Sequence, residues 1–493
     1  MIKHFLYIIC TVLPFLNLWA QPYIILSESL ESANTDRTYH LIHYDSTSYA
    51  VMRTDKAFRY AETELFDAKL KYLKTFVSTP DKRFYVGAIN LEGRLHMLYS
   101  RFKINKELER TEDVSFWAIP MSRDSFYAAG DSIALVEPFI MYSPKYKGNY
   151  VLSPDRSKVL VYHYEEDGDI EEVEGLTNEI TLRVFDNKFK LLWVRKVNLA
   201  PNPSGKRVMS IKKLRVSNKG EVSILTDYFR NHRSYNLKEV TADPTLFFVG
   251  EDPANFARLT PNLGNLYYNQ IDFMYDQDGN IIWFGFYSNQ KYHQQAGYFY
   301  IKINADRTKI LSKKICPFSE ELLKQLLNTK KLPKKPEVRN FEMLYFKMNA
   351  EGDLVISAEF QPYGVSNFKS HNLLVLRIDS KGDLRWAKHI YKYNIFPYNL
   401  KVFLQHYMQI DGNNVYLLYN QGIYAEDGKA VAIRIDEKGD ISEKTIFGYL
   451  AQENVICPSL CTPLPDGRCF LSLQSRFFKY HQSGILDFRK LFK

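Results

Sequence analysis

The sequence lacks the short motifs that identify many enzymes. It has no G-x-S-x-G turn, no H-E-x-x-H zinc motif, no phosphate-binding loop and no G-x-G-x-x-G dinucleotide motif. Its 11 histidines are scattered, so no spacing marks a catalytic set, although a site assembled from distant segments stays open. We assign no catalytic residue, no metal ligand and no cofactor, and we expect a non-enzyme.

Long apolar runs and glycosylation sites are also scarce. The candidate sequon Asn202-Pro203-Ser204 is blocked by its proline, which favours a bacterial source over a secreted eukaryotic one. The one long apolar run, Phe5 to Trp19, follows Lys3 and precedes Ala20, as is typical of a signal peptide at residues 1–20. Residues 21–493 then form an exported chain without a transmembrane span, in the periplasm or at the cell surface and beyond.

Cysteines are few, and four lie beyond residue 20: Cys316, Cys457, Cys461 and Cys469. In an oxidising compartment Cys461 can pair with Cys457 or Cys469. The alternative is that all are buried as small apolar side chains. Neither spacing matches a zinc site, and the acidic loop 165–174 fails the spacing of a calcium-binding EF-hand.

The net charge of +9 is mild for this length, and lysine and arginine are spread along the chain. This balance permits attraction to an acidic protein, an anionic glycan or lipid head groups. Export argues against a nucleic-acid partner.

One short sequence motif, which we call the Asp-turn phrase, recurs along the chain. It reads LFDAKLKYLK at Asp67, VFDNKFKLLW at Asp186, RIDSKGDLRW at Asp379 and RIDEKGDISE at Asp436, with looser copies at Asn105 and Asn304. Each copy is two alternating apolar runs joined by a turn, which is the pattern of a β-hairpin. We expect each Asp to accept hydrogen bonds from the amides of its own turn, because a residue needed in every unit is a folding device.

A second hairpin with a glycine turn alternates with the first, from a degenerate copy near Asp45 to Gly467, at intervals of about sixty residues. Two hairpins per period give four strands, and such units stack around an axis as a β-propeller. The sequence therefore predicts an all-β fold, a β-propeller of eight four-stranded blades in one domain, residues 21–493. Seven blades is the alternative, if the first and last units complete one another. The stretch 241–249 is expected to fill the place of a missing hairpin.

The segment LLVLRIDSKGDLRWAKHI, from Leu373 to Ile390, resembles the repeat of exported bacterial propellers of the form K/R-L-D-x-x-G-x-x-x-W-x-K. It is also similar to quinoprotein-like propellers. That resemblance implies that Asp379, Gly382 and Trp386 lock adjacent blades together. It concerns architecture, because such propellers serve as enzymes, lectins and scaffolds alike.

Two segments are candidate binding sites. A short helical insertion near 319–328, capped by Ser319, carries an apolar stripe that either packs on the propeller or docks a partner: Leu322, Leu323, Leu326 and Leu327. A basic run follows it: Lys330, Lys331, Lys334 and Lys335. An aromatic cluster of Tyr267, Tyr268, Tyr292 and His293 either stacks on a sugar or packs within strands.

The resulting functional hypothesis is an exported, non-catalytic propeller that binds or scaffolds another cell-envelope or extracellular component, foremost a protein. The alternative is carbohydrate binding or glycan cleavage. Cleavage would require paired carboxylates at one mouth of the ring. The identity of the partner and the oligomeric state are not encoded in any motif.

Overall fold

The fold is described here from a computed structural model. It describes residues 23–31, 38–45, 47–54, 61–78, 83–105, 110–122, 128–141, 149–165, 179–199, 208–229, 244–260, 263–264, 266–290, 294–361, 367–397, 402–423, 425, 427–449, 454–475 and 480–493. The predicted signal peptide, residues 1–20, lies outside these ranges. Within them, no helix is long and apolar enough to span a membrane.

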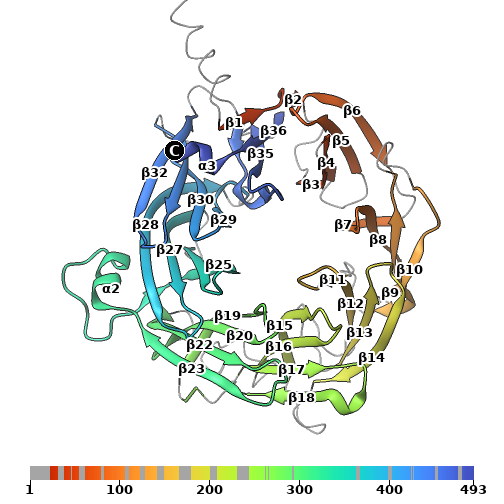
Figure 1. The fold of residues 1–493 in the computed structure, drawn as a ribbon, viewed down its shortest axis with the longest axis horizontal. Coiled ribbons are helices and arrows are strands. Elements are labelled where there is room, and N and C mark those ends of the chain that lie inside the picture. The colour runs from red at the N-terminus through yellow and green to blue at the C-terminus, as the bar shows by residue number, and fades with distance from the viewer. Residues whose placement is uncertain are drawn as a thin grey trace, which may run out of the picture.

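The described strands form eight four-stranded antiparallel blades around a common axis (Figure 1). The prediction of an eight-bladed propeller is confirmed. In each blade the first strand lies nearest the axis and the fourth at the rim.

The strands of the first four blades are as follows. Blade 1 contains β3 (Thr38–Tyr44), β4 (Ser48–Thr54), β5 (Ala61–Asp67) and β6 (Tyr72–Ser78). Blade 2 contains β7 (Arg83–Leu91), β8 (Arg94–Asn105), β9 (Arg110–Pro120) and β10 (Ile133–Met141). Blade 3 contains β11 (Asn149–Leu152), β12 (Lys158–Glu165), β13 (Glu179–Asp186) and β14 (Leu191–Asn198). Blade 4 contains β15 (Val208–Val216), β16 (Val222–Phe229), β17 (Thr245–Val249) and β18 (Phe256–Leu259).

The other four blades complete the ring. Blade 5 contains β19 (Tyr267–Tyr275), β20 (Ile281–Ser288), β22 (Gly297–Ile303) and β23 (Ile310–Pro317). Blade 6 contains β25 (Phe341–Met348), β26 (Leu354–Phe360), β27 (Asn367–Ile378) and β28 (Leu384–Pro397). Blade 7 contains β29 (Tyr407–Asp411), β30 (Asn414–Gln421), β31 (Lys429–Ile435) and β32 (Ile441–Gly448). Blade 8 contains β33 (Asn454–Ile456), β35 (Cys469–Ser475), β36 (Tyr480–Leu486) and β1 (Ile24–Leu26).

Shorter elements accompany the blades. The strand pair β21 (Gln294–Gln295) and β24 (Val338–Arg339) flanks blade 5, while β2 (Leu30–Glu31) and β34 (Thr462–Pro463) extend blade 8. The helices of the described residues are α2 (Glu320–Leu326), α3 (Phe488–Leu491) and the 3-10 turns η2 (Pro253–Asn255) and η4 (Pro458–Leu460).

Blade 8 closes the ring with strands from both ends of the chain. The N-terminal β1 pairs antiparallel with the C-terminal β36, with Ile24 opposite Leu486 and Leu26 opposite Gly484. The first and last segments of the chain do complete one another, which was the condition for seven blades. The blade count is still eight, because β1 precedes β3 to β6, which form a complete blade without it.

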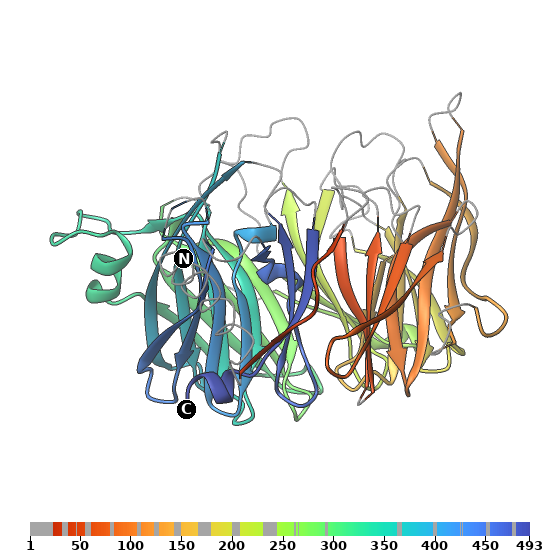
Figure 2. The ribbon, with the colours of Figure 1, turned by 90° about the horizontal axis from the view of Figure 1, so that it is seen from above.

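Blades 1 to 7 are four-stranded meanders, so the connections of each fall on two faces of the ring, which Figure 2 shows from the side. The first-to-second and third-to-fourth strand turns share one face, which we call the turn face. The second-to-third strand loops and the links between blades share the other, which we call the loop face.

The repeated Asp residues cap the turns of the turn face, as predicted. Asp379 Oδ1 accepts hydrogen bonds from the backbone amides of Lys381 and Asp383, each at 2.9 Å. Equivalent pairs of bonds occur at Asp67, Asp186 and Asp436. Asn304 plays the same part in blade 5. The copy at Asn105 was misplaced, because it ends β8 on the loop face.

The hairpin expected to be disguised near 241–249 is β17 and β18. Its turn contains Asp252, whose Oδ1 accepts from the amide of Ala254 at 2.8 Å. The capping role is thus kept while the surrounding phrase has changed.

Neighbouring blades are joined by apolar faces and by contacts to these turns. One buried cluster joins blades 3 and 4, and another joins blades 6 and 7. Trp386 of blade 6 donates from Nε1 to the carbonyl of Glu437 in the next blade at 3.2 Å, and its ring lies against Gly439. This is the interblade contact that the resemblance implied for Trp386.

Candidate functional site: a hollow on the turn face

The turn face carries a hollow of about 460 Å³. It is lined by first-hairpin turns of four successive blades, 3 to 6, and by the second turn of blade 5. Its lining residues are Pro154, Ser217, Asn218, Lys219, Glu221, Tyr275, Asp276, Gln277, Asp278, Gly279, Ala305, Arg307, Met348 and Asn349. Five turns from four blades therefore converge on one concave surface, which we call the turn-face hollow.

Short turns with internal hydrogen bonds fix the wall of the hollow. Asp276 Oδ1 accepts from the amides of Asp278 at 3.0 Å and Asn280 at 2.8 Å. Gly220 and Gly279 hold φ of 87° and 80°, the left-handed conformation that glycine adopts without strain. The exposed side chains at the tips, such as Asn218 and Gln277, thus project from a rigid frame.

Most carboxylates of the hollow already have partners. Glu221 forms an ion pair with Arg307, and Asp276 lies 2.8 Å from the Nζ of Lys302. Asp278 and Lys219 are exposed at the turn tips. The hollow therefore lacks a pair of unengaged carboxylates of the kind that glycosidases use, as far as the described residues show.

Tyr275 and Arg307 line the same hollow but are held in place. Tyr275 donates from its hydroxyl to Ser223 Oγ at 2.8 Å, and burial raises its pKa to about 12. The Arg307 guanidinium lies 5.1 Å from the centre of the Phe248 ring. At neutral pH Tyr275 is therefore a protonated hydrogen-bonding group rather than a base.

A second arrangement has the connectivity of a catalytic triad but is sealed. His406 Nδ1 lies 2.9 Å from Glu359 Oε2, and its Nε2 contacts the hydroxyl of Ser357. The side chains of Glu359 and His406 are fully buried, and so is Ser357. No substrate reaches them in this conformation, so the arrangement joins blades 6 and 7 instead of forming an open site.

Lys392 completes this sealed network. Its Nζ lies 2.7 Å from Glu359 Oε1 and also donates to the carbonyl of Leu404. Burial raises the pKa of Glu359, but Lys392 and His406 outweigh burial and lower it to about 2. Burial lowers the pKa of Lys392 and that of His406. The stable arrangement is a Lys–Glu ion pair beside a neutral imidazole.

A related network joins blades 8 and 1. Arg53 pairs with Glu62 at 2.9 Å and with Glu64, and His481 Nε2 lies 3.0 Å from Glu64. These side chains are also buried. Buried polar networks between blades are thus a recurrent feature of the loop-face half of the ring.

Two of the four aromatic candidates, Tyr267 and Tyr268, belong to the residues that the structure describes. Tyr268 of β19 packs edge-on against Phe299 at 5.9 Å, and Tyr267 is half-buried at the start of the same strand. Tyr292 and His293 lie outside the described residues, as does most of the acidic loop 165–174. For Tyr268 the contact is strand packing, not an open stacking face.

Three of the four leucine candidates lie on α2, and Leu327 is its C-cap residue. Ser319 caps the helix, as predicted, and accepts from the amide of Leu322 at 3.2 Å. Leu322, Leu323 and Leu326 are buried in the cluster that joins blades 5 and 6, and Leu327 packs at its edge. The chain itself therefore covers the apolar stripe. None of the candidates that the structure describes lines the turn-face hollow.

The residues of the hollow and of the sealed networks are not among those that the sequence pattern indicated as candidates. Lys219, Gln277 and Asp278 sit inside the glycine turns that the repeat did mark. The signal available was their position in successive turns, since turns of successive blades share one face. Ser357, Glu359 and His406 carried no comparable signal.

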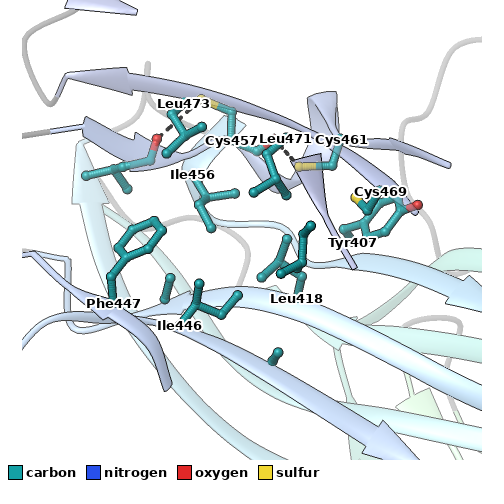
Figure 3. Packing of buried hydrophobic residues seen from close by; sticks show 14 of the residues in the cluster. Tyr407, Leu418, Ile446, Phe447, Ile456, Cys457, Cys461, Cys469, Leu471 and Leu473 are labelled. Atoms are coloured by element: carbon teal, nitrogen blue, oxygen red, sulfur yellow. Dashed lines mark hydrogen bonds between the residues drawn. The ribbon is translucent and has the colours of Figure 1, made fainter. Parts of the chain in front are cut away.

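The thiols of Cys316, Cys457, Cys461 and Cys469 are all free. The last three belong to one apolar cluster beside Tyr407 and Leu471 (Figure 3). Burial raises the pKa of Cys457 and Cys469, which makes both poor nucleophiles. Among the described side chains, no group of three or more His, Cys, Asp or Glu is placed to hold a metal ion.

No family model matches the sequence, and no curated protein is significantly similar to it. Solved structures with a related overall shape are distant. An uncharacterized protein from Listeria monocytogenes EGD-e is 10% identical over 84% of this chain and 96% of that chain, with a TM-score of 0.35. AztD of Citrobacter koseri is 12% identical over 85% and 90%, with a TM-score of 0.35. An ulvan lyase of polysaccharide lyase family PL25 is 10% identical over 80% and 90%, with a TM-score of 0.38. Such likenesses assign neither a family nor an activity to this chain.

Proposed function

We propose that this chain is an exported, non-catalytic propeller that binds a protein of the cell envelope or extracellular space at the turn-face hollow. The observation that carries the proposal is the convergence of turns from four adjacent blades on one rigid concavity. Eight of its 14 lining residues carry amide or charged side chains, while apolar atoms make up the larger part of the lining surface. Such a mixture of apolar surface and polar groups is typical of surfaces that bind another protein.

The state of the acidic groups supports a binding role over glycan cleavage. Hydrolysis of a glycosidic bond uses two carboxyl groups that face the substrate together. In the hollow, Glu221 and Asp276 are committed to Arg307 and Lys302. Export rests on the predicted signal peptide, and N-terminal sequencing of the mature chain, expected to begin at Gln21, tests it.

Site-specific photocrosslinking tests the binding role. A photoreactive amino acid replaces Asn218 or Gln277, which are exposed in the hollow, and Lys381 serves as a control on the turn face outside it. We expect one discrete protein adduct from intact cells at positions 218 and 277 and none at 381. Equal adducts at all three positions would refute the proposal.

A glycan array separates the carbohydrate alternative. Saturable binding of one oligosaccharide that is lost in Lys219→Ala and kept in Lys381→Ala would replace the protein proposal with a lectin. We expect no such binding.

A further inference from the structure

The link between blades 5 and 6 contains α2, which lies at the rim of the ring (Figures 1 and 2). This link forms a second hollow. It has a volume of about 440 Å³ and is formed by α2 and the turn that follows. Four lysines line it, Lys324, Lys330, Lys331 and Lys334, together with Glu320, Leu332 and two prolines. We call it the lysine hollow.

The segment that forms the lysine hollow is anchored at both ends. At its start, the leucines of α2 are buried against blades 5 and 6. At its end, Glu337 accepts from Ser288 Oγ at 2.8 Å and from the amide of Asn289 at 2.9 Å, and the carbonyl of Lys335 accepts from Gln290 at 3.2 Å. The lysines are therefore presented by a fixed scaffold and not by a free tail.

The positive charge of the lysine hollow is poorly balanced by the protein. Glu320 is the carboxylate of its lining, and it lies 3.6 Å from Lys324 in an exposed pair. No carboxylate of the described residues lies within ion-pair distance of Lys330, Lys331 or Lys334, which are exposed. Ammonium groups gathered around one concavity repel each other and favour an anion that carries more than one charge.

We propose that the lysine hollow binds a phosphate group, either free or on a lipid head group. A phosphate monoester carries about −1.5 to −2 charges near neutral pH. Its oxygens accept hydrogen bonds from several ammonium groups, and lysine binds phosphate as a point charge. A carboxylate offers one charge and leaves most of the lysines uncompensated. The site is independent of the turn-face hollow, so the two proposals stand or fall separately.

The test uses the full mature chain and two matched triple variants. The first neutralises the hollow: Lys330→Gln, Lys331→Gln and Lys334→Gln. The second removes the same charge from exposed lysines that do not line it and lie outside this segment: Lys188→Gln, Lys309→Gln and Lys438→Gln. All six side chains are exposed, and thermal unfolding verifies that both variants fold.

Titration calorimetry with inorganic pyrophosphate and co-sedimentation with vesicles that contain phosphatidic acid, whose head group is a phosphate monoester, against phosphatidylcholine vesicles, measure binding. We expect saturable binding that the first triple variant weakens by about a hundredfold and the second leaves within about twofold, since each lysine near an anionic surface contributes about fivefold. Binding to pyrophosphate alone would identify a free phosphate ligand. Binding to vesicles that pyrophosphate displaces would identify a head group.

Two results would overturn the proposal. One is equal weakening by both triple variants, which would show general charge attraction only. The other is the absence of saturable binding to either probe at physiological ionic strength.

Discussion

His406 Nδ1 lies 2.9 Å from Glu359 Oε2, although the two residues belong to different blades. The imidazole precedes β29 of blade 7, and the carboxylate projects from β26 of blade 6. Lys392 lies on the opposite oxygen of the same carboxylate at 2.7 Å. One buried carboxylate therefore ties together two strands of blade 6 and the entry to blade 7.

The sealed ion pair predicts a large penalty when one partner is removed. Glu359→Gln leaves Lys392 charged and unpaired in a fully buried site, which should cost about 3–5 kcal/mol of unfolding free energy. Lys392→Met should cost a similar amount, because Glu359 is then left without its cation. The double variant should lose less than the sum of both, since no buried charge remains unpaired. Urea unfolding followed by tryptophan fluorescence measures all three.

Lys196 offers the matched control for this prediction. It lies 2.9 Å from Glu179, but both side chains are at least 40% exposed. Lys196→Met should cost less than about 1 kcal/mol. An equal loss of unfolding free energy in Lys196→Met and Lys392→Met would show that burial does not govern the strength of the Lys392–Glu359 pair.

The burial of His406 predicts loss of stability at mildly acidic pH. Its folded pKa is lowered by burial, so the unfolded chain binds the proton more readily. This contribution is present above pH about 6.5, the ordinary histidine pKa, and is lost as the pH falls below it. The slope from this one group is at most about 1.4 kcal/mol per pH unit.

The measurement compares unfolding free energies of the wild type and His406→Gln between pH 5.5 and 7.5. The pH dependence of the unfolding free energy should be shallower in the variant, because the share of His406 is lost. It should not vanish, because burial also lowers the pKa of His96 and His389. Glu359, with a pKa of about 2, loses its contribution only below its unfolded value near pH 4.5. An unchanged slope in the variant would contradict a neutral, buried His406.

The parts of this fold that the sequence could predict are those that each blade repeats. Asp379 and Asp436 belong to a repeated motif, because each of these hairpins uses an Asp to cap its turn amides. The regular spacing of the repeated turns in the sequence predicted the number of blades. The helix at 319–328 was visible for another reason, since a leucine stripe after Ser319 breaks the alternating pattern.

The parts that could not be predicted depend on which blades become neighbours. Glu359 and His406 are 47 positions apart, and His481 and Glu64 are 417 apart, so no local pattern links either pair. Each network occurs once, without a repeat to reveal it. The turn-face hollow is similar, since it is made by tip residues such as Lys219 that vary from turn to turn.

Two glycines with left-handed backbone predict different responses to the same substitution. Gly412 has φ of 58° with nothing within 4 Å of an added Cβ, so Gly412→Ala should cost about 1 kcal/mol from the backbone alone. Gly382 has φ of 93°, and an added Cβ would lie 2.5 Å from the Tyr300 ring of blade 5. That ring is fixed by its hydroxyl bond to the carbonyl of Ser380 at 2.9 Å. Gly382→Ala should therefore cost about 3 kcal/mol or more, measured by chemical unfolding. Similar costs at both sites would mean that the interblade contact of Tyr300 yields easily.

Closure of the ring by β1 predicts opposite outcomes at two adjacent residues. Ile24 is 6% exposed and packs in the cluster that joins blades 7 and 8, whereas Ile25 is 42% exposed on the other side of the strand. Ile24→Asp places a charge in that cluster and should lower the unfolding free energy by about 4 kcal/mol or more. Ile25→Asp keeps the pairing with β36 and should change the unfolding free energy by less than about 1 kcal/mol.

Thermal unfolding and limited proteolysis measure both variants. In Ile24→Asp the first cleavages are expected within blade 8, because loss of β1 leaves β36 as an unpaired edge. Equal stability of the two variants would mean that β1 does not close the ring in solution, since only a strand that packs with one side against the cluster between blades 7 and 8 distinguishes its two sides.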